Sequence, residues 1–174
     1  MTKAKTTTPD KILLGYGIVE IDGSPVGLTR GGSTFNVERT FRNIEADGDR
    51  GPVKGRIAFD SETAKLVVNA LEIFDIDTIK TVYAAMGKDT NVLSSKPSIS
   101  EDDYHQVVWR GKTHDGSEVV IELPQAISLS NLDFTFEDKN EVVPALEFTA
   151  TYKEDSRDES SYSITFGSTT PDEG

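Results

Sequence analysis

The feature that most constrains this chain is an alternation of apolar and polar side chains along many short segments. In segment 34–42, Phe35, Val37 and Phe41 share one face, and the opposite face is polar. A period of two is typical of a β-strand with one buried face. Because this alternation recurs along most of the chain, we predict an antiparallel β protein. Further strands are expected over 13–21, 64–71, 104–110, 118–123, 132–137, 146–152 and 161–166.

Two pairs of these segments are expected to form hairpins. The polar turn Asp138-Lys139-Asn140 joins 132–137 to 146–152, and a second expected hairpin has Asp115-Gly116 at its turn. Asp, Asn and Gly are favoured in tight turns, because they tolerate left-handed backbone conformations.

One segment, 75–86, has the spacing of a helix instead. Asp75 or Asp77 is suited to cap its start, and Gly87 suits the position just after its end. We therefore predict one short helix. The apolar residues at helical spacing are Ile76, Ile79, Val82, Tyr83 and Met86.

These elements together predict the fold class and the domain organisation. We expect an all-β protein with one short helix, built as an antiparallel β-sandwich with a long extended inter-strand loop. A single domain is expected over 11–166, since the 174 residues of the chain are enough for one ordinary domain. The polar segments 1–10 and 167–174 are expected to be a disordered N-terminal arm and a disordered C-terminal tail.

The composition limits the chemistry that the chain is able to carry. It has no cysteine and two histidines, His105 and His114, so neither a disulfide nor a zinc site is expected. The net charge of −12, without a Lys/Arg cluster, argues against a protein that grips nucleic acid by its phosphates. No apolar run approaches the roughly 20 residues that cross a bilayer. We expect synthesis in the cytoplasm without ordinary export.

Acidic pairs are the remaining candidates for catalysis, and we interpret them as structural. The pair Asp75/Asp77 and the run Glu101-Asp102-Asp103 fall in expected caps and polar turns of an acidic chain. Neither a nucleophile-elbow motif nor a phosphate-binding glycine motif occurs. Trp109 is interpreted as a core residue of its strand. We therefore predict that the protein is not an enzyme and has no cofactor.

The segment 44–55, IEADGDRGPVKG, is too long for a tight hairpin loop. Loops of this length in a compact domain are usually functional or disordered. Two interpretations stay open: a floppy surface loop, or an arm that becomes ordered against a partner. Acid followed by base in this strip is suited to pairing with a copy of itself. The candidate inter-subunit residues are Asp47, Asp49, Arg50, Gly51, Pro52, Val53 and Lys54.

The stretch 27–55, GLTRGGSTFNVERTFRNIEADGDRGPVKG, resembles the tail tube proteins, or major tail proteins, of long-tailed bacteriophages. Several members share a glycine-rich turn, here at 27–32, an alternating strand that contains a glutamate, and a loop like 47–55. The likeness continues through a strand that ends at Leu71-Glu72, the short helix, and the late segment 123–126. The resemblance rests on the order of several weak motifs along nearly the whole chain.

The resemblance implies a structural virion protein that assembles with copies of itself. Such siphophage subunits are β-sandwiches with a helix at the side, and they form rings, generally hexameric, that stack into the hollow tail tube. Sheets of neighbouring subunits join into a continuous inner β-barrel, and the long loop reaches a neighbour. The implied partners are a tape measure protein, a tail terminator, and baseplate or tip proteins. The implied location is the tail of the virion, with assembly in the host cytoplasm and passage of DNA through the lumen during genome ejection.

Polar strand faces are the candidates for the lining of that lumen. An acidic conduit does not hold DNA, because it offers the phosphates no favourable contact. The other interpretation is that these faces lie in outer solvent. The residues concerned are Asp133, Thr135, Glu137, Glu147, Thr149 and Thr151.

A different class of function also fits the sequence. A stand-alone β-sandwich binding module, for a carbohydrate or an adhesion partner, is the alternative. The two classes differ in assembly, since the first predicts rings or tubes and the second predicts a monomer that binds a ligand.

Overall fold

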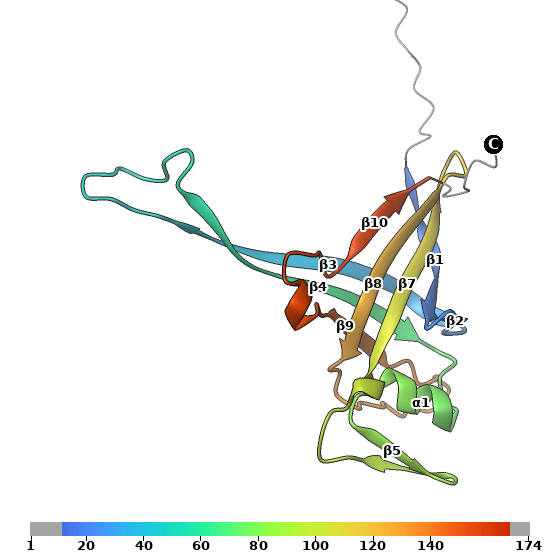
Figure 1. Cartoon of the computed structure of the whole chain (residues 1–174). Coiled ribbons are helices and arrows are strands. Elements are labelled where there is room, and N and C mark those ends of the chain that lie inside the picture. The colour runs from blue at the N-terminus through green and yellow to red at the C-terminus, as the bar shows by residue number, and fades with distance from the viewer. Residues whose placement is uncertain (1–11, 168–174) are drawn as a thin grey trace, which may run out of the picture.

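The computed structural model describes residues 12–167, and the expected disordered segments 1–10 and 167–174 lie outside the described residues, except for Gly167. Over 12–167 the chain is an antiparallel β protein with one short α-helix, as predicted (Figure 1). The helix is α1 (Ile76–Val82), and two short 3-10 helices are η1 (Glu101–Asp103) and η2 (Glu154–Ser156). The strands are β1 (Leu13–Ile21), β2 (Ser24–Pro25), β3 (Thr29–Asn43), β4 (Ile57–Ala70), β5 (Met86–Asp89), β6 (Val92–Ser95), β7 (Tyr104–Thr113), β8 (Glu118–Ser128), β9 (Ala145–Ala150) and β10 (Ser163–Phe166).

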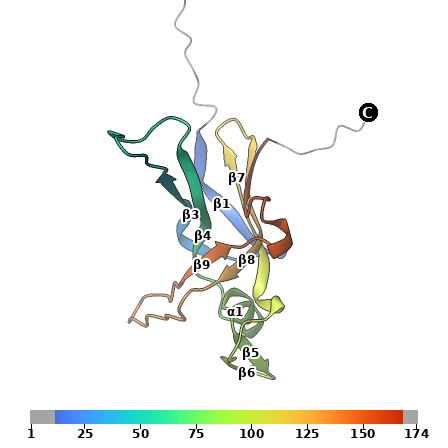
Figure 2. The same ribbon diagram turned by 60° about the vertical axis from the view of Figure 1, so that its left-hand side comes forward.

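Eight strands form one continuous sheet in the order β2-β1-β7-β8-β9-β4-β3, with β10 added to β8, and β5 pairs with β6 apart from it. β8 changes neighbours along its length, because residues 119–122 pair with β10 and residues 126–128 pair with β9. Pro124 lies between these two parts and has no N–H to donate to a ladder. The sheet folds over here, so β3, β4 and β9 form one layer and β1, β7, β8 and β10 form the other (Figure 2).

The core lies between these two layers. Ala64, Leu66 and Val68 alternate along β4 and are almost fully buried, while Phe35 and Val37 of β3 pack against the edge of the core. A period of two is what one buried face of a strand requires. The predicted antiparallel sandwich is therefore present as one sheet folded on itself. The facing layer contributes Val19, Ile21, Val107, Trp109, Val119, Ile121 and Leu123.

The helix begins where the sequence predicts and ends earlier. Asp75 is its N-cap, and the carboxylate accepts two backbone hydrogen bonds of the first turn, both at 3.1 Å. α1 ends at Val82, four residues before the predicted end at Met86, which instead begins β5. The N–H of Lys96 donates to the carbonyl of Ala85 at 2.6 Å, next to the β5–β6 ladder. Tertiary pairing therefore overrides the helical spacing in this part of the chain.

The predicted hairpin of 132–137 with 146–152 does not form. β9 pairs with β4 along 145–149 on one side and with β8 along 148–150 on the other, and 132–137 pairs with neither edge. That segment lies outside any strand. The ring of Phe134 packs against those of Phe74 and Tyr83, with centroids 5.0 and 6.3 Å apart. Of the alternating apolar residues in 132–137, Phe134 therefore packs on the body, whereas Leu132 and Phe136 are exposed.

The second predicted hairpin is formed by β7 and β8. Gly116 lies in its turn with a left-handed φ of 86°, a conformation that favours glycine. The last predicted strand is present but begins at Ser163, as β10. β3 and β4 are longer than predicted, and the extra residues 57–63 of β4 lie in the part of the hairpin that leaves the body.

Candidate functional site

The hairpin of β3 and β4 projects from the body as an arm, which we define as residues 38–62 (Figure 1). The two strands stay paired as far as Asn43 and Ile57, and the predicted loop 44–55 lies at the tip. Six residues of extended strand carry the tip roughly 20 Å beyond the body. The long loop is therefore the end of a paired ribbon.

The tip is organised by hydrogen bonds around Asp49. Its carboxylate accepts a hydrogen bond from the backbone N–H of Ala46 at 2.8 Å and another from the guanidinium of Arg56 at 2.9 Å. Gly48 and Gly55 turn the chain with φ values of 88° and 87°. Asp49, a candidate for contact with a neighbour, thus already has partners inside its own tip. Arg56, which sequence reasoning did not single out, is one of them.

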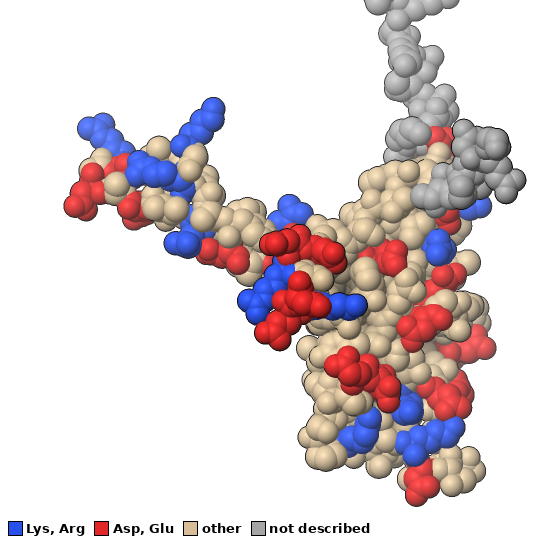
Figure 3. Space-filling model, viewed as in Figure 1, with Lys and Arg blue, Asp and Glu red and all other residues tan. Residues whose placement is uncertain are grey.

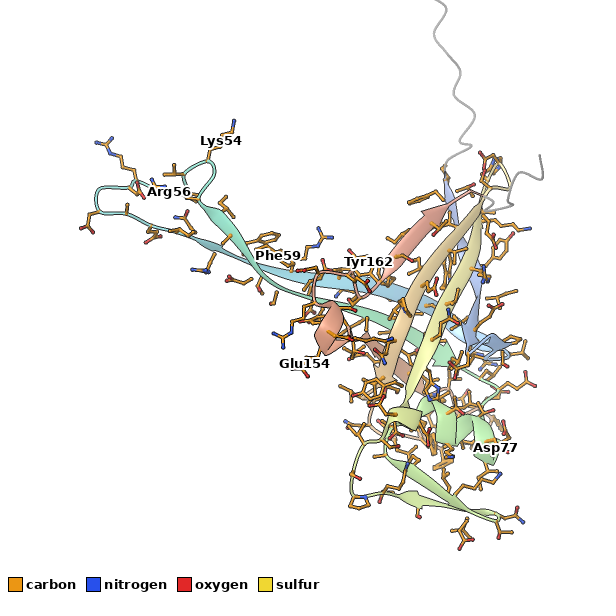
Figure 4. The ribbon with its side chains drawn as sticks, viewed as in Figure 1. Lys54, Arg56, Phe59, Asp77, Glu154 and Tyr162 are labelled. Atoms are coloured by element: carbon orange, nitrogen blue, oxygen red, sulfur yellow. The ribbon has the colours of Figure 1, made fainter. Side chains whose placement is uncertain are left out.

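The other candidate inter-subunit residues lie mostly on the surface of the tip. Within residues 12–167, the side chains of Asp47, Arg50 and Lys54 make no ion pair and no hydrogen bond. Figure 4 shows Lys54 pointing away from the tip into open space. These charges are therefore free to meet another molecule. Val53 is half-buried, and the exposed residues are Asp47, Arg50, Gly51, Pro52 and Lys54.

One face of the arm is apolar and uncovered. Phe41 and Phe59 are cross-strand partners, with ring centroids 5.6 Å apart, and Ile57 follows on the same face. Phe41, Ile57 and Phe59 are between 57% and 59% exposed. We call these three residues the arm strip. Sequence reasoning missed Ile57 and Phe59, although their alternation with Ala58 and Asp60 is the signal that finds them.

A polar contact separates the arm strip from the core. The guanidinium of Arg39 donates to a carboxylate oxygen of Glu62 at 3.0 Å and to the hydroxyl of Tyr162 at 2.9 Å. The ring of Tyr162 packs against Phe35 at the core edge, with centroids 5.4 Å apart. The core therefore ends at this contact, and the apolar face of the ribbon resumes beyond it.

The candidate lumen residues are brought together only in part. Asp133, Thr135, Glu137 and Glu147 line one open hollow of about 750 Å³ with Arg30. Outside this set, Thr149 lies beside Lys65 on the outer face of β9, and Thr151 donates from its hydroxyl to the carbonyl of Gln125 at 3.0 Å. The hollow is acidic, although Arg30 pairs with Glu141 at 2.7 Å and Lys65 pairs with Glu147 at 3.1 Å.

Charge is distributed unevenly between the arm and the rest of the chain. Five of the 18 Lys and Arg residues and six of the 30 Asp and Glu residues lie within 38–62. The arm thus carries −1 of the net charge of −12, and the remainder of the chain carries −11. Figure 3 shows Lys and Arg beside Asp and Glu at the end of the arm, whereas Asp and Glu predominate along the body. Another copy of the acidic chain therefore meets less electrostatic repulsion at the arm than at the rest of the chain.

Two of the acidic side chains considered for catalysis, Asp75 and Asp103, have roles in the fold. Asp103 is 6% exposed, and its carboxylate accepts backbone hydrogen bonds from Ser100 at 2.7 Å and Ala85 at 3.1 Å. Burial raises the pKa of Asp103, but these hydrogen bonds outweigh it and leave the pKa below its ordinary value. Hydrogen bonds from Thr78 likewise lower the pKa of the N-cap Asp75. Over 12–167, no three His, Asp or Glu side chains are grouped so as to hold a metal ion.

No protein-family model and no curated protein matches this sequence. In the described part of the chain, no helix has the length and apolar character needed to span a membrane. The arm, the hollow and the sheet edges are the features of this chain that bear on its function.

Proposed function

We propose that this protein is a structural subunit that assembles into stacked, hexameric rings and so forms the hollow tail tube of a long-tailed phage. The observation that carries the proposal is the arm, an organised ribbon that leaves its own body with an apolar face and free charges exposed. Exposed apolar surface of this kind marks a contact with another protein. In a tube, the protein that contacts the arm is a second copy of the same chain.

Free sheet edges support the same proposal. β3 ends the sheet on one side, and β1 nearly ends it on the other, because only Glu20 and Ile21 pair with the short β2. Edge strands offer unpaired N–H and C=O groups, which invite pairing with another chain. A ring of copies satisfies these groups by closing one sheet onto the next, as the resemblance to tail tube proteins implies.

In this proposal the chain has no catalytic role. The acidic body suits a conduit through which DNA passes without specific binding, because no counterions are released on contact. The hollow with Asp133, Thr135, Glu137 and Glu147, and the neighbouring Thr149, are the proposed lining of the lumen. The tape measure protein, the tail terminator and the tip proteins are the proposed partners in the virion.

Negative-stain electron microscopy of the purified protein over a range of concentrations tests the proposal. We expect rings or tubes whose number and length grow with concentration. The alternative, a stand-alone binding module, predicts a monomer at every concentration that binds a carbohydrate or an adhesion partner. A strictly monomeric species at high concentration would contradict the tube.

A further inference from the structure

The two layers of the sandwich are offset, so that each extends past the other with its core-facing side uncovered. On the ribbon layer this overhang is the arm strip, which continues the face that carries Phe35 and Val37. Cross-strand partners share a face of a sheet, so the pairing of Phe41 with Phe59 places both on the core-facing side. The arm strip is therefore an apolar, core-facing surface that no other layer of the same chain covers.

The opposite layer has an overhang of its own, formed by residues of β1 and β10. Ile164 pairs with Ile121 and Phe166 pairs with Val119, whose side chains are buried in the core. Phe166 is 77% exposed and Ile164 is 42% exposed, although they lie on this core-facing side. Leu13 is the partner of Thr113, which is also buried, and is itself 46% exposed.

An apolar hollow lies between this second overhang and the ribbon. Its volume is about 340 Å³. Together with Leu13, Ile164 and Phe166 we call it the mouth. In Figure 1, β1 and β10, the strands that carry Leu13, Ile164 and Phe166, extend upward from the ribbon and lie apart from the tip of the arm. The lining side chains are those of Leu13, Leu14, Phe35, Leu66, Trp109 and Ile121, with Gly15 and Ser33.

We propose that the arm strip of one copy packs onto the mouth of the next copy, so that the β-sandwich continues from chain to chain. The inference rests on the proposed function in one respect, that the partner is a second copy of this chain. It assigns both sides of the contact, namely Phe41, Ile57 and Phe59 on one copy and Leu13, Ile164 and Phe166 on the other.

The geometry of the layers favours a second copy of the chain as the partner that covers the arm strip. Because the two layers face one another, their core-facing sides point in opposite directions. A neighbour in a similar orientation, shifted along the arm, therefore presents its mouth to the arm strip. Two different surfaces meet, so the contact is head-to-tail, and it closes into a ring when the rotation between copies closes.

Charge favours the same occupant. Two copies that each carry −12 repel one another. The arm carries only −1 of that charge, and the unpaired side chains at its tip include the cations Arg50 and Lys54 as well as the anion Asp47. It is therefore the part of the chain that approaches the acidic body of a neighbour with the least repulsion.

Engineered cysteines test this contact without ambiguity, because the chain has none of its own. A Phe59→Cys sample is mixed with a Phe166→Cys sample and treated with a short bis-maleimide, and cross-linked dimers are counted by denaturing electrophoresis. The control mixture pairs Phe59→Cys with Val92→Cys, since Val92 is 65% exposed on the β5–β6 hairpin. An Ile57→Cys and Ile164→Cys pair repeats the measurement if a first variant fails to fold.

We expect at least tenfold more mixed dimer from the first mixture than from the control. Equal yields in the two mixtures, or dimers of Phe166→Cys with itself in excess, would overturn the contact. The proposed function fails separately. If wild-type protein forms tubes but the cysteine mixtures show no selective cross-linking, the proposed function holds and this contact is wrong. If cross-linking is selective but no rings or tubes form, the contact holds and the proposed function is wrong.

Discussion

Trp109 is the residue whose surroundings are most restrictive. A Cβ added to Gly17 of β1 or to Gly111 of β7 would overlap the indole ring of Trp109, so the ring lies directly over both glycines. Trp109 is 8% exposed, which agrees with its interpretation as a core residue. The two glycines are thus required by close approach of a large ring, and not by a left-handed backbone.

Gly17→Ala is expected to destabilise the protein by about 1–3 kcal/mol, because the indole must move out of a well-packed site. Chemical denaturation measures the loss, and the fluorescence of Trp109, the one tryptophan of the chain, reports the displacement. Gly15→Ala in the same strand is the matched control, since a Cβ there meets nothing within 4 Å. Equal effects of the two substitutions would show that the contact with Trp109 is unimportant.

At the scale of elements, the outer part of the arm lies apart from the core, and Arg39 at its base bonds to Tyr162. Phe41, Ile57 and Phe59 do not belong to the core cluster, and the ladder of the arm is held by its own pairs, such as Arg42 with Asp60 at 2.8 Å. The tip adds a further internal pair, Asp49 with Arg56. Removal of the tip therefore leaves the contacts of the core intact.

Deletion of residues 47–54 is expected to leave a folded β-domain that no longer polymerises. The tip cations and the bonds that close the ribbon are lost, while Trp109 and the core are untouched. Thermal unfolding followed by Trp109 fluorescence checks the fold, and sedimentation with electron microscopy checks assembly. Tubes at the wild-type concentration would show that the tip is not the assembly element.

On the scale of the whole molecule, the dominant quantity is the net charge of −12. Copies packed in a ring bring these charges within a few tens of ångströms of one another. The Debye length is about 30 Å at 0.01 M salt and about 8 Å at 0.15 M. Repulsion between copies is therefore strongly dependent on salt.

Assembly is expected to strengthen with salt over this range. If screening removes about 1.4 kcal/mol of repulsion per added copy, the critical concentration falls about tenfold. The critical concentration is measured at each ionic strength by sedimentation of the assembled protein. A critical concentration that rises with salt would mean that attraction by Arg50 and Lys54 outweighs the repulsion, and an Arg50→Ser/Lys54→Ser variant would then lose the effect.

The sequence by itself determined most of the strands and the start of the helix. Alternation at 34–42, the apolar run at 64–71, turn residues at 115–116 and the cap at Asp75 are local signals, and the structure has a strand, a turn or a cap at each of them. The irregular segment 44–55 was also readable, because glycine, proline and charge interrupt the alternation there. These properties depend on neighbours in the chain, which the sequence displays directly.

Only the tertiary structure decided which strands pair and which apolar faces are covered. The alternation at 132–137 looks like that of a strand, but β9, its expected partner, pairs with β4 and β8 instead. Phe41 likewise continues the pattern of Phe35, yet one residue lies at the core and the other lies in the open. The difference arises from the offset of two layers whose strands are far apart in sequence. Their relative position is set by long-range packing, which no local pattern encodes.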